Sequence, residues 1–517
     1  MDRPTPYQPG AHAALHPGRP AVITAAGKVV TFAELEGSSC RLAHAFVAHG
    51  LVPGDHVALV LPNDHRTHEV AWAAHRSGLY YTMVNTHLTA EEAAYIINDC
   101  GAKVLVTSSA LAPLADELTD RIPDATLRLM VNPGGAPAIE GYVDLDTFVA
   151  GQPAIPLDAE TEGSPMLYSS GTTGRPKGVR RELSGLPFGV VPPMAPMLSR
   201  MMQFADGDVY LSPAPLYHSA PLVWTMTAHR LGGTVVIMER FDPEECLRLI
   251  ERFHVTHGQF VPTMFVRMLK LSDEIRSAYD LSSIKSIVHA AAPCPPEVKR
   301  KMIEWWGPVV CEYYSGTEGG GLTWATSTDA LERPGTVGKA LIGTVHICGD
   351  DGSEVEAGVD GVVWFDSGQR ARFEYNNDPE KTRQTFNEHG WSTLWDVGHL
   401  DADGYLYLTD RKLFMIVSGG VNIYPQEIED VLALHPAVSD VAVFGIPEPE
   451  MGEQVKAVVQ LAPGVTPSPE VAEEIMAFCR ERLANYKCPR SVDFTDALPR
   501  GENGKLYKKK LRDSYWT

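Results

Sequence analysis

The sequence predicts an α/β protein with a large N-terminal domain of βα-built sheets and a small C-terminal α+β domain. The chain has 517 residues, more than one ordinary core requires, so we expect at least two domains. Helical and strand patterns alternate over about the first 400 residues. Beyond them the pattern changes to a compact module of about a hundred residues, a usual size for a domain.

Two segments show the alternation of helix and strand most clearly. Residues 91–109, EEAAYIINDCGAKVLVTSS, place apolar residues at helical spacing and then continue into the β-branched run VLVTS. In residues 241–262, FDPEECLRLIERFHVTHGQFVP, Asp242 and Pro243 open a helix that precedes a short strand. This alternation predicts βα units and largely parallel sheets. The segment SPMLYSSG, residues 164–171, is expected to be a strand that leads into a loop.

The C-terminal module has hairpin and helix signals of its own. Residues 401–412, DADGYLYLTDRK, predict a hairpin that turns at Asp403 and Gly404. Pro425 is expected at the first position of a helix that ends before Pro436. The remaining elements are the strand VSDVAVFGIP (438–447), the strand QVKAVVQLAP (454–463), the helix PEVAEEIMAFCRERLANY (469–486) and a basic tail. We place the boundary at residues 411–413, which gives domains 1–411 and 412–517.

Charge and composition exclude several classes of protein. The formal net charge of −21 would repel nucleic acid and anionic membranes, so neither is expected as a partner. No apolar run is long enough to span a bilayer, and the start has no signal-peptide core. The eight cysteines are scattered without a C-x-x-C pair, which favours reduced thiols over a disulfide framework or a zinc site. We therefore expect a cytoplasmic protein.

The stretch YSSGTTGRPKGV, residues 168–179, is suited to wrapping an anion. Its hydroxyls, its glycine N–H groups and Lys177 can all donate hydrogen bonds, and it has few apolar side chains to bury. A Walker-type phosphate loop needs Gly before the lysine and Ser or Thr after it. Here Pro176 precedes Lys177 and Gly178 follows it, so both requirements fail and a Walker-type NTPase is disfavoured. A plain surface turn is the alternative interpretation.

Three further clusters follow along the chain. The segment EYYSGTEGGG (312–321) combines Tyr314, whose ring can stack on a base, with Thr317 and Glu318, which can hold phosphate and Mg²⁺. The segment 391–412 contains Asp396 and Arg411. In the tail LPRGENGKLYKKKLR (498–512), Lys505 follows a tight Asn-Gly turn. Each cluster alone is typical of an ordinary turn or of solvated surface charges.

In this order and at these separations, the four clusters resemble the adenylate-forming superfamily of acyl-CoA synthetases, peptide-synthetase adenylation domains and firefly luciferase. The resemblance runs from about residue 20 to the end of the chain and is greatest to bacterial acyl-CoA synthetases, the fatty-acid and aryl-acid CoA ligases. Further motifs follow in family order: APLYHSA (214–220), AAAPCP (290–295) and SGGVNIYPQEIE (418–429).

The resemblance implies a two-step reaction. A carboxylate attacks the α-phosphorus of ATP to give an acyl-adenylate and pyrophosphate, and the thiol of coenzyme A then displaces AMP. An anion must attack an anion, so the site has to supply positive charge and positioning. The family's C-terminal domain is mobile and rotates between the two steps.

The resemblance also implies a role for each matching residue. The ATP-binding loop would comprise Ser169, Ser170, Gly171, Thr172, Thr173, Gly174 and Lys177. Adenine would lie between Tyr314 and the Ala292-Pro293 backbone, with Asp396 on the ribose and Arg411 on ribose or phosphate. Glu318 would anchor Mg²⁺, and Thr317 would contact the α-phosphate. Lys505 would bridge the attacking carboxylate and the α-phosphate, a role that suits a flexible ammonium donor. His218 would gate the acid pocket, and Gly419 and Gly420 would line the thiol tunnel.

Three departures from the family pattern bear on which molecule accepts the acyl group from the adenylate. Leu394, Trp395 and Asp396 stand where Thr-Gly-Asp is usual, and Leu413 stands at the expected pivot. Tyr-Gly-x-Thr-Glu becomes Tyr-Ser-Gly-Thr-Glu at residues 314–318. These departures weaken the implication that coenzyme A is the second substrate.

The acid is expected to be apolar, either aromatic or fatty. The segments assigned to the acid pocket lie near His218 and at residues 259–265, 290–295 and 315–321. They are mostly apolar or small and offer no Asp or Arg for an amino-acid head group. The small residues 290–292 and 319–321 are expected to leave the pocket wide.

The leading hypothesis is therefore an ATP-dependent acid–CoA ligase whose partner is a small-molecule acid. A second hypothesis keeps adenylation but transfers to an amine or to a carrier protein in trans, or activates nitrite for diazotisation of an aryl amine. A third is a nucleotide-binding homologue that has lost catalysis, which the retained charged residues disfavour. The sequence leaves open whether the protein forms a homodimer.

Overall fold

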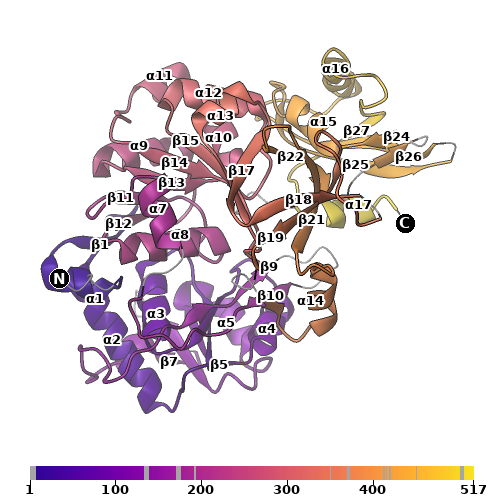
Figure 1. The fold of residues 1–517 in the computed structure, drawn as a ribbon. Coiled ribbons are helices and arrows are strands. Elements are labelled where there is room, and N and C mark those ends of the chain that lie inside the picture. Colours follow the sequence, from indigo (N-terminus) through magenta and orange to yellow (C-terminus); the bar gives the residue numbers. More distant parts are fainter. Residues whose placement is uncertain are drawn as a thin grey trace. The chain divides into compact units, whose positions relative to one another are not determined.

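The computed structural model describes residues 7–132, 139–169, 176–190, 194–349, 351–368, 373–411, 414, 416–418, 421–449, 451–500 and 506–516. For residues 194, 410, 411, 417, 421 and 422 it describes the backbone alone. The chain, which Figure 1 colours from its N-terminus to its C-terminus, divides into two compact units. Unit 1 comprises Met1–Phe260, Lys270–Val288 and Arg372–Gln384, and unit 2 comprises Val261–Leu269, His289–Ala371 and Thr385–Thr517.

Unit 1 contains a six-stranded parallel sheet. Its strand order is β7-β6-β5-β3-β4-β8, and every neighbouring pair is parallel. The strands are β3 (His56–Val60), β4 (Tyr80–Met83), β5 (Ala102–Ser108), β6 (Leu127–Val131), β7 (Val143–Asp144) and β8 (Ser164–Pro165). The helices α4 (Ala90–Asp99) and α5 (Ala112–Leu118) bury their apolar residues in one core with this sheet. The expected βα units with parallel strands are thus confirmed.

A second sheet of unit 1 has the order β14-β13-β11-β12-β1-β2. The pairs β1/β12, β11/β12 and β11/β13 are parallel, and β2 is an antiparallel edge strand. The strands are β1 (Pro20–Thr24), β2 (Val29–Thr31), β11 (Val209–Ser212), β12 (Thr234–Ile237), β13 (His257–Phe260) and β14 (Ser286–His289). The helix α9 (Pro243–Phe253) starts after its N-cap Asp242, as predicted, and leads into β13.

Two helices of unit 1 are buried along most of their length. In α3 (His65–Arg76) every residue from Thr67 onward is buried, and in α8 (Ser219–Arg230) every residue except Ser219, Ala220 and Val223 is buried. They are linked by His68 Nε2 and Thr225 Oγ1, which lie 3.0 Å apart. The other helices of unit 1 are α1 (Pro9–Leu15), α2 (Phe32–Ala48), η1 (Ser109–Leu111), α6 (Leu145–Phe148), α7 (Met194–Met201), α11 (Asp273–Ser277) and α14 (Pro379–Thr385).

A small antiparallel sheet completes unit 1. It has the order β20-β10-β9, with β9 (Leu167–Ser169), β10 (Lys177–Arg180) and β20 (Glu374–Tyr375). Its central strand begins at Lys177. The predicted strand at 164–171 is therefore present as the two short strands β8 and β9.

Unit 2 contains an antiparallel sheet in the order β18-β19-β21-β22-β17-β16-β15. The strands are β15 (Val310–Tyr314), β16 (Leu322–Ala325), β17 (Thr336–Ile342), β18 (Thr344–Cys348), β19 (Gly361–Asp366), β21 (Ser392–Leu400) and β22 (Leu406–Arg411). The hairpin of β21 and β22 turns at Asp403 and Gly404, where Gly404 has a φ of 82°, as the sequence predicts. The helices α10 (Pro262–Leu269), α12 (Pro296–Trp306) and α13 (Ser327–Glu332) belong to the same unit.

The C-terminal part of unit 2 has its own sheet and core. Strands β24-β23-β26-β25 form the sheet, and β27 pairs with β26 in parallel. The elements are β23 (Ile416–Ser418), β24 (Val421–Ile423), α15 (Pro425–Leu432), β25 (Val438–Glu448), β26 (Gly452–Leu461), α16 (Pro469–Arg480), β27 (Ser491–Thr495) and α17 (Lys508–Asp513). The predicted strands and helices are all present, although α16 ends six residues before Tyr486. The domain boundary after residue 411 stays a prediction, because the two compact units divide the chain elsewhere.

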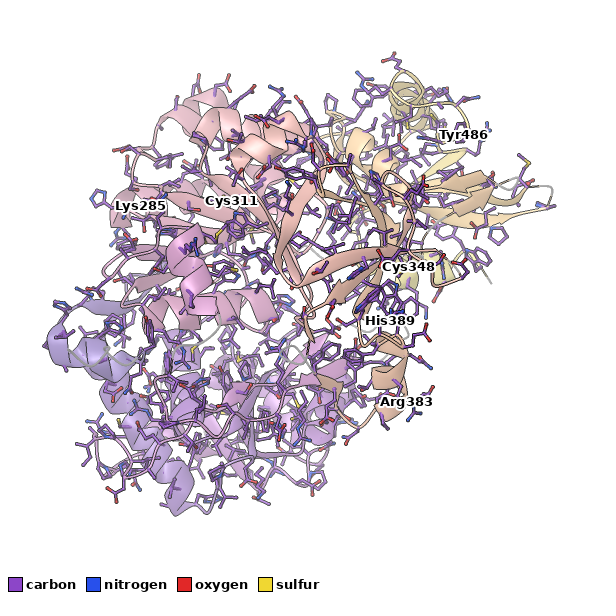
Figure 2. The ribbon with its side chains drawn as sticks, in the orientation of Figure 1. Lys285, Cys311, Cys348, Arg383, His389 and Tyr486 are labelled. Carbon is purple, nitrogen blue, oxygen red and sulfur yellow. The ribbon has the colours of Figure 1, made fainter. Side chains whose placement is uncertain are left out.

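All eight cysteines lie among the described residues, and none of them forms a disulfide there. Cys311 and Cys348, labelled in Figure 2, stand on the separate strands β15 and β18. Within the described part of the chain, no helix combines the length and the apolar character needed to cross a membrane.

Candidate active site

The ends of the expected phosphate loop lie on neighbouring strands of the small sheet in unit 1. Ser169 on β9 and Lys177 on β10 are paired across the two antiparallel strands. The two ends of the expected loop therefore lie side by side. The ring of Tyr168 covers Gly178, where an added Cβ would lie 2.9 Å from the ring carbon Cζ. Ser170, Gly171, Thr172, Thr173 and Gly174, all predicted here, lie outside the described residues.

Lys177 is held by residues that the sequence analysis did not select. Its Nζ lies 2.9 Å from Oδ2 of Asp378 and 5.6 Å from the ring centroid of Tyr375. The Lys177 ammonium, followed by the backbone N–H of Lys381, keeps the pKa of Asp378 below its usual value. Asp378 follows Lys177 by 201 residues and precedes a proline, so its sequence context indicates a helix start and not an ion pair.

Asp99, at the end of α4, anchors both sides of this small sheet. Its Oδ2 accepts from the Tyr168 hydroxyl at 2.5 Å, and its backbone carbonyl accepts from Asn376 Nδ2 at 2.7 Å and Asn377 Nδ2 at 3.1 Å. The backbone N–H of Asn376 donates to the Gly178 carbonyl at 2.8 Å. Asp99 therefore fixes β9 and the segment leading to Asp378 to one point of unit 1.

His218, the expected gate of the acid pocket, lies at the start of α8. It is half-buried, and its ring centroid is 4.4 Å from that of Tyr217. The preceding segment is fixed by the buried side chain of Asn63, which donates to the carbonyls of Ala214 and Met238 and accepts from the Leu216 N–H at 2.7 Å. Asn63 thus sets where α8 begins, a role with no local signal in the sequence.

In unit 2 the structure brings Tyr314 and Asp396 together. The Tyr314 hydroxyl donates to Asp396 Oδ2 at 2.7 Å, although the two residues are 82 positions apart. The ring of Tyr314 also lies 5.9 Å from that of Phe365 on β19. Asp396 is buried, and its backbone pairs with that of Arg411 across β21 and β22. The Arg411 side chain lies outside the description.

Thr317 and Glu318 lie on a turn between β15 and β16. The Gly319 N–H donates to the Gly316 carbonyl at 3.0 Å, and Gly319 has a φ of 65°, which favours glycine. Glu318 is only 8% exposed. A carboxylate of this kind suits Mg²⁺, which usually binds one or two carboxylates together with substrate phosphates. Among the residues that the structure describes, no group of three or more His, Cys, Asp or Glu is arranged to hold a metal ion.

The next two glycines do not widen a pocket, contrary to our expectation from the sequence. An added Cβ at Gly320 would overlap Ser392 Oγ, and one at Gly321 would overlap the ring of Phe365. Both glycines therefore allow the turn to pack closely on β19 and β21.

The turn expected to cover adenine follows β14. Ala291 has a φ of 74°, a left-handed conformation that is uncommon for a residue with a side chain. Ala292 is half-buried and Pro293 is exposed. In the elements that follow this turn, Lys299 of α12 and Glu312 of β15 form a buried ion pair that holds the helix to the strand.

Trp395, which stands where a glycine is usual, also adopts a left-handed conformation. Its φ is 64°, which costs about 1–2 kcal/mol for a residue that carries a Cβ. Its N–H donates to Thr393 Oγ1 at 2.9 Å, and its half-exposed ring lies edge-on to Trp364, with centroids 6.2 Å apart. The backbone thus keeps the shape that glycine would allow, and the ring turns outward.

The remaining predicted residues, Gly419, Gly420 and Lys505, lie outside the described residues. Their flanks are described: Ser418 pairs with Val421 across the β23–β24 hairpin, and Arg500 forms an antiparallel bridge with Leu506.

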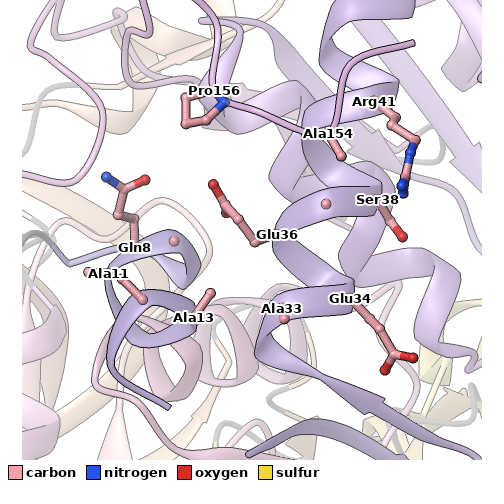
Figure 3. A pocket seen from close by; sticks show the side chains of 13 residues that line it. Gln8, Ala11, Ala13, Ala33, Glu34, Glu36, Ser38, Arg41, Ala154 and Pro156 are labelled. Carbon is pink, nitrogen blue, oxygen red and sulfur yellow. The ribbon is translucent and has the colours of Figure 1, made fainter. Parts of the chain in front are cut away.

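A surface groove of about 790 Å³ lies in unit 1 between α1, α2 and residues 154–156 (Figure 3). Small side chains line most of it, together with Glu34, Glu36 and Arg41. None of the predicted nucleotide or acid residues lines this groove, so it is separate from the candidate site.

Comparison with known proteins identifies the family of the chain. The AMP-binding enzyme model matches residues 10–372, and the model of the AMP-binding enzyme C-terminal domain matches residues 427–505.

Individual relatives align over nearly the whole chain. The chain is 33% identical to the long-chain-fatty-acid–CoA ligase FadD13 of Mycobacterium tuberculosis over 498 residues, which is 94% of this chain and 93% of that protein. It is 33% identical to a feruloyl-CoA synthase of an Amycolatopsis species over 489 residues, 94% of each. The solved structure of the amide bond synthetase McbA from Marinactinospora thermotolerans superposes with a TM-score of 0.80 at 28% identity, covering 98% of this chain and 99% of that one. The chain therefore belongs to the AMP-binding enzyme family, among its AMP-forming acid–thiol ligases.

Proposed function

We propose that this protein is an ATP-dependent acid–CoA ligase that activates an apolar carboxylic acid, aromatic or fatty. The observation that carries the proposal is the hydrogen bond from Tyr314 to Asp396. It joins the residue expected to stack on adenine with the residue expected to bind ribose, so that one nucleoside can contact both.

In the first half-reaction the phosphate loop, through Thr172, Thr173 and Lys177, holds the pyrophosphate portion of ATP. Lys505 donates to the attacking carboxylate and the α-phosphate, which reduces the repulsion between two anions. Thr317 contacts the α-phosphate from the turn after β15. Adenine lies between Tyr314 and the Ala292-Pro293 backbone, and Arg411 steadies the ribose or a phosphate.

Glu318 is the residue that would hold Mg²⁺. The ion supplies neutralisation of the phosphate charge when it is bound. Because Glu318 is buried and carried on a tight turn, its carboxylate is held ready and loses little freedom on binding.

In the second half-reaction the thiol of coenzyme A attacks the acyl carbon of the adenylate, a tetrahedral intermediate collapses, and AMP leaves. We propose that the C-terminal domain, residues 412–517, rotates between the half-reactions, with Leu413 at the pivot. Gly419 and Gly420 then line the thiol channel, and His218 controls access to the acid. The location of the enzyme in the cytoplasm remains part of this proposal.

The class of acid is supported by the residues and by the relatives. The expected acid-pocket segment 259–265 contributes buried apolar side chains, among them Phe260 and Phe265. The names of the two relatives describe a long-chain fatty acid and a feruloyl group as substrates of those proteins. Both are largely apolar acids.

A second candidate function has its own support. The relative McbA is an amide bond synthetase, whose acceptor is an amine. In this chain, Leu394 and Trp395 depart from the usual pattern beside Asp396. Adenylation followed by transfer to an amine, or nitrite activation with an aryl amine, is therefore the alternative.

One experiment separates the two functions. A panel of aromatic and fatty acids is incubated with the purified enzyme, ATP and Mg²⁺, with and without coenzyme A, and pyrophosphate, AMP and product are measured. Nitrite with an aryl amine is included in the panel. The proposal predicts product formation only with coenzyme A, and full turnover without the thiol would refute it in favour of the alternative.

A further inference from the structure

The strand β21 is interrupted beside the candidate site. On the neighbouring strand β19, Trp364 pairs with Thr393 and Val362 pairs with Val397. Three residues of β21, from 394 to 396, therefore stand opposite the single residue Val363. This is a bulge, a feature that commonly redirects side chains next to active sites.

The conformation of Trp395 creates the bulge. Its φ of 64° departs from the extended backbone of the rest of the strand. The hydrogen bond from its N–H to Thr393 Oγ1, and that from the Thr393 hydroxyl to the Val363 carbonyl at 2.8 Å, hold the bulge against β19.

Leu394, before Trp395, packs on the turn that carries Glu318. A Cβ added to Gly316 would lie 2.7 and 2.8 Å from the two Leu394 methyl carbons. The same point is 2.8 Å from Glu318 Oε2. A leucine side chain and the Glu318 carboxylate thus share the space that any side chain at position 316 would need.

Asp396, after Trp395, contacts the other end of the same segment. Its Oδ2 accepts from the hydroxyl of Tyr314, two residues before Gly316. The bulge therefore contacts the segment 314–318 at its nucleoside end through Asp396 and at its carboxylate end through Leu394.

We propose that Leu394 and Gly316 are a pair of positioning residues that set the Glu318 carboxylate. The inference rests on the proposed function, in which Glu318 holds Mg²⁺. Leu394 fills the space over Gly316, and position 316 must be glycine because Leu394 and Glu318 occupy that space. Leu394, a departure from the family pattern, is thus accommodated by the absence of a side chain at Gly316.

The test is a double-mutant cycle with a structural control. The variants are Gly316→Ala, Leu394→Ala and the double variant Gly316→Ala/Leu394→Ala. Leu400→Ala is the control, because Leu400 is a half-buried leucine of the same strand whose contacts are in the sheet core. Calorimetry measures the affinity for AMP without metal and for ATP with and without Mg²⁺, and thermal unfolding checks the fold.

We expect Gly316→Ala to weaken the Mg²⁺-dependent part of ATP affinity about tenfold and to leave AMP affinity within about twofold. Leu394→Ala alone should weaken the same part about threefold, because the carboxylate loses its packing. The double variant should recover to within about threefold of wild type, since the alanine then has room. Leu400→Ala should lower the unfolding temperature without changing the Mg²⁺ dependence.

Three outcomes would overturn the inference. They are a double variant no better than Gly316→Ala, an equal loss of AMP and Mg²⁺-dependent ATP affinity, and the same shift in Leu400→Ala. If Gly316→Ala does not fold, Leu394→Ala still decides, because an unchanged Mg²⁺ dependence there would exclude a positioning role. If wild-type ATP affinity did not depend on Mg²⁺ at all, the assigned role of Glu318 would fail first, and the inference with it.

Discussion

The ammonium of Lys177 is paired with the carboxylate of Asp378, 2.9 Å away, on the segment that follows the strand next to its own. In the proposed function, the phosphates of ATP would approach a lysine that already has a counter-ion, together with a carboxylate of like charge. Lys177 is 18% exposed and Asp378 is 37% exposed, so solvent screens the pair and its net effect is modest.

Asp378→Asn should lower the KM for ATP about threefold at low ionic strength, because one negative charge near the phosphates is removed. Asparagine can still accept the Lys381 N–H that Asp378 accepts at 2.9 Å, so α14 should keep its start. Lys177→Ala should raise the KM for ATP and leave the range of accepted acids unchanged. Initial rates of pyrophosphate release at several salt concentrations measure both effects.

The matched control for this prediction is Glu374→Gln, on the same small sheet. Glu374 pairs loosely with Arg180, 3.7 Å away, and both side chains are largely exposed. Its substitution should leave the KM for ATP unchanged. A KM that rises in Asp378→Asn would mean that Asp378 orients Lys177 and does not compete with the phosphates.

The buried, neutral ring of His229 predicts that the protein loses stability in acid. The Trp72 indole N–H donates to its Nδ1 at 3.2 Å, so Nδ1 must accept, and Nε2 carries the proton and donates to the Ala21 carbonyl at 3.0 Å. Burial lowers the pKa of this ring to about 4, below the 6.5 of an unfolded histidine. The neutral ring is therefore favoured by the fold, and its stabilisation is complete above pH 6.5 and lost as the pH falls towards 4.

The lowered pKa of His229 corresponds to a loss of about 3 kcal/mol in the free energy of unfolding when the pH falls from 7 to 4. Urea unfolding at both pH values should show wild type losing about this much more stability than His229→Gln, whose amide does not titrate in this range. An equal loss in both proteins would show that other groups cause the acid sensitivity.

Because the backbone of Trp395 is left-handed, we expect glycine at this position to be more stable than alanine, the reverse of the usual order in a strand. Trp395→Gly and Trp395→Ala both remove the ring and its contact with Trp364, but only glycine has no steric penalty at a φ of 64°. The glycine variant should therefore be more stable than the alanine variant by about 1 kcal/mol. Thermal unfolding measures the difference.

Trp364 on β19 is the control for this comparison, because it lies in regular strand. There Trp364→Ala should be more stable than Trp364→Gly, the ordinary order for a strand. The same ordinary order at position 395 would contradict the left-handed conformation.

The features that the sequence predicts depend on neighbouring residues, whereas those that it misses depend on contacts between residues far apart in the chain. The start of α9 at Asp242 and the hairpin turn at Gly404 are written in neighbouring residues, and both are confirmed. Asn63 and Asp378 hold parts of the candidate site from positions about 150 and 200 residues away, and nothing local marks them. The bulge at Trp395 is a further case, because tryptophan gives no signal for a left-handed conformation.

Lys505→Ala should reduce pyrophosphate release about a hundredfold or more, since the ammonium acts where two anions meet. Transfer from a pre-made acyl-adenylate to coenzyme A should remain largely intact, because no such repulsion exists in that step. Lys510→Ala, at an exposed position on α17, should change neither step. Equal loss in both half-reactions of Lys505→Ala would refute the assigned role.

Gly420→Leu decides whether coenzyme A is the acceptor. If residues 419 and 420 line a channel for the pantetheine arm, a leucine side chain would obstruct the thiol. Pyrophosphate release should then remain near wild type while thioester formation falls about a hundredfold. Single-turnover assays of each half-reaction measure the two rates separately.

The opposite results are equally informative. If the two glycines only turn the chain between Ser418 and Val421, which are paired strand residues, the leucine would disturb the hairpin and lower both rates together. Thermal unfolding would show that loss as a lower melting temperature. If the acceptor is an amine, wild type should release AMP and form product without any thiol, and Gly420→Leu should leave amide formation unchanged. A selective loss of thioester formation at an unchanged melting temperature is thus expected only when coenzyme A is the second substrate.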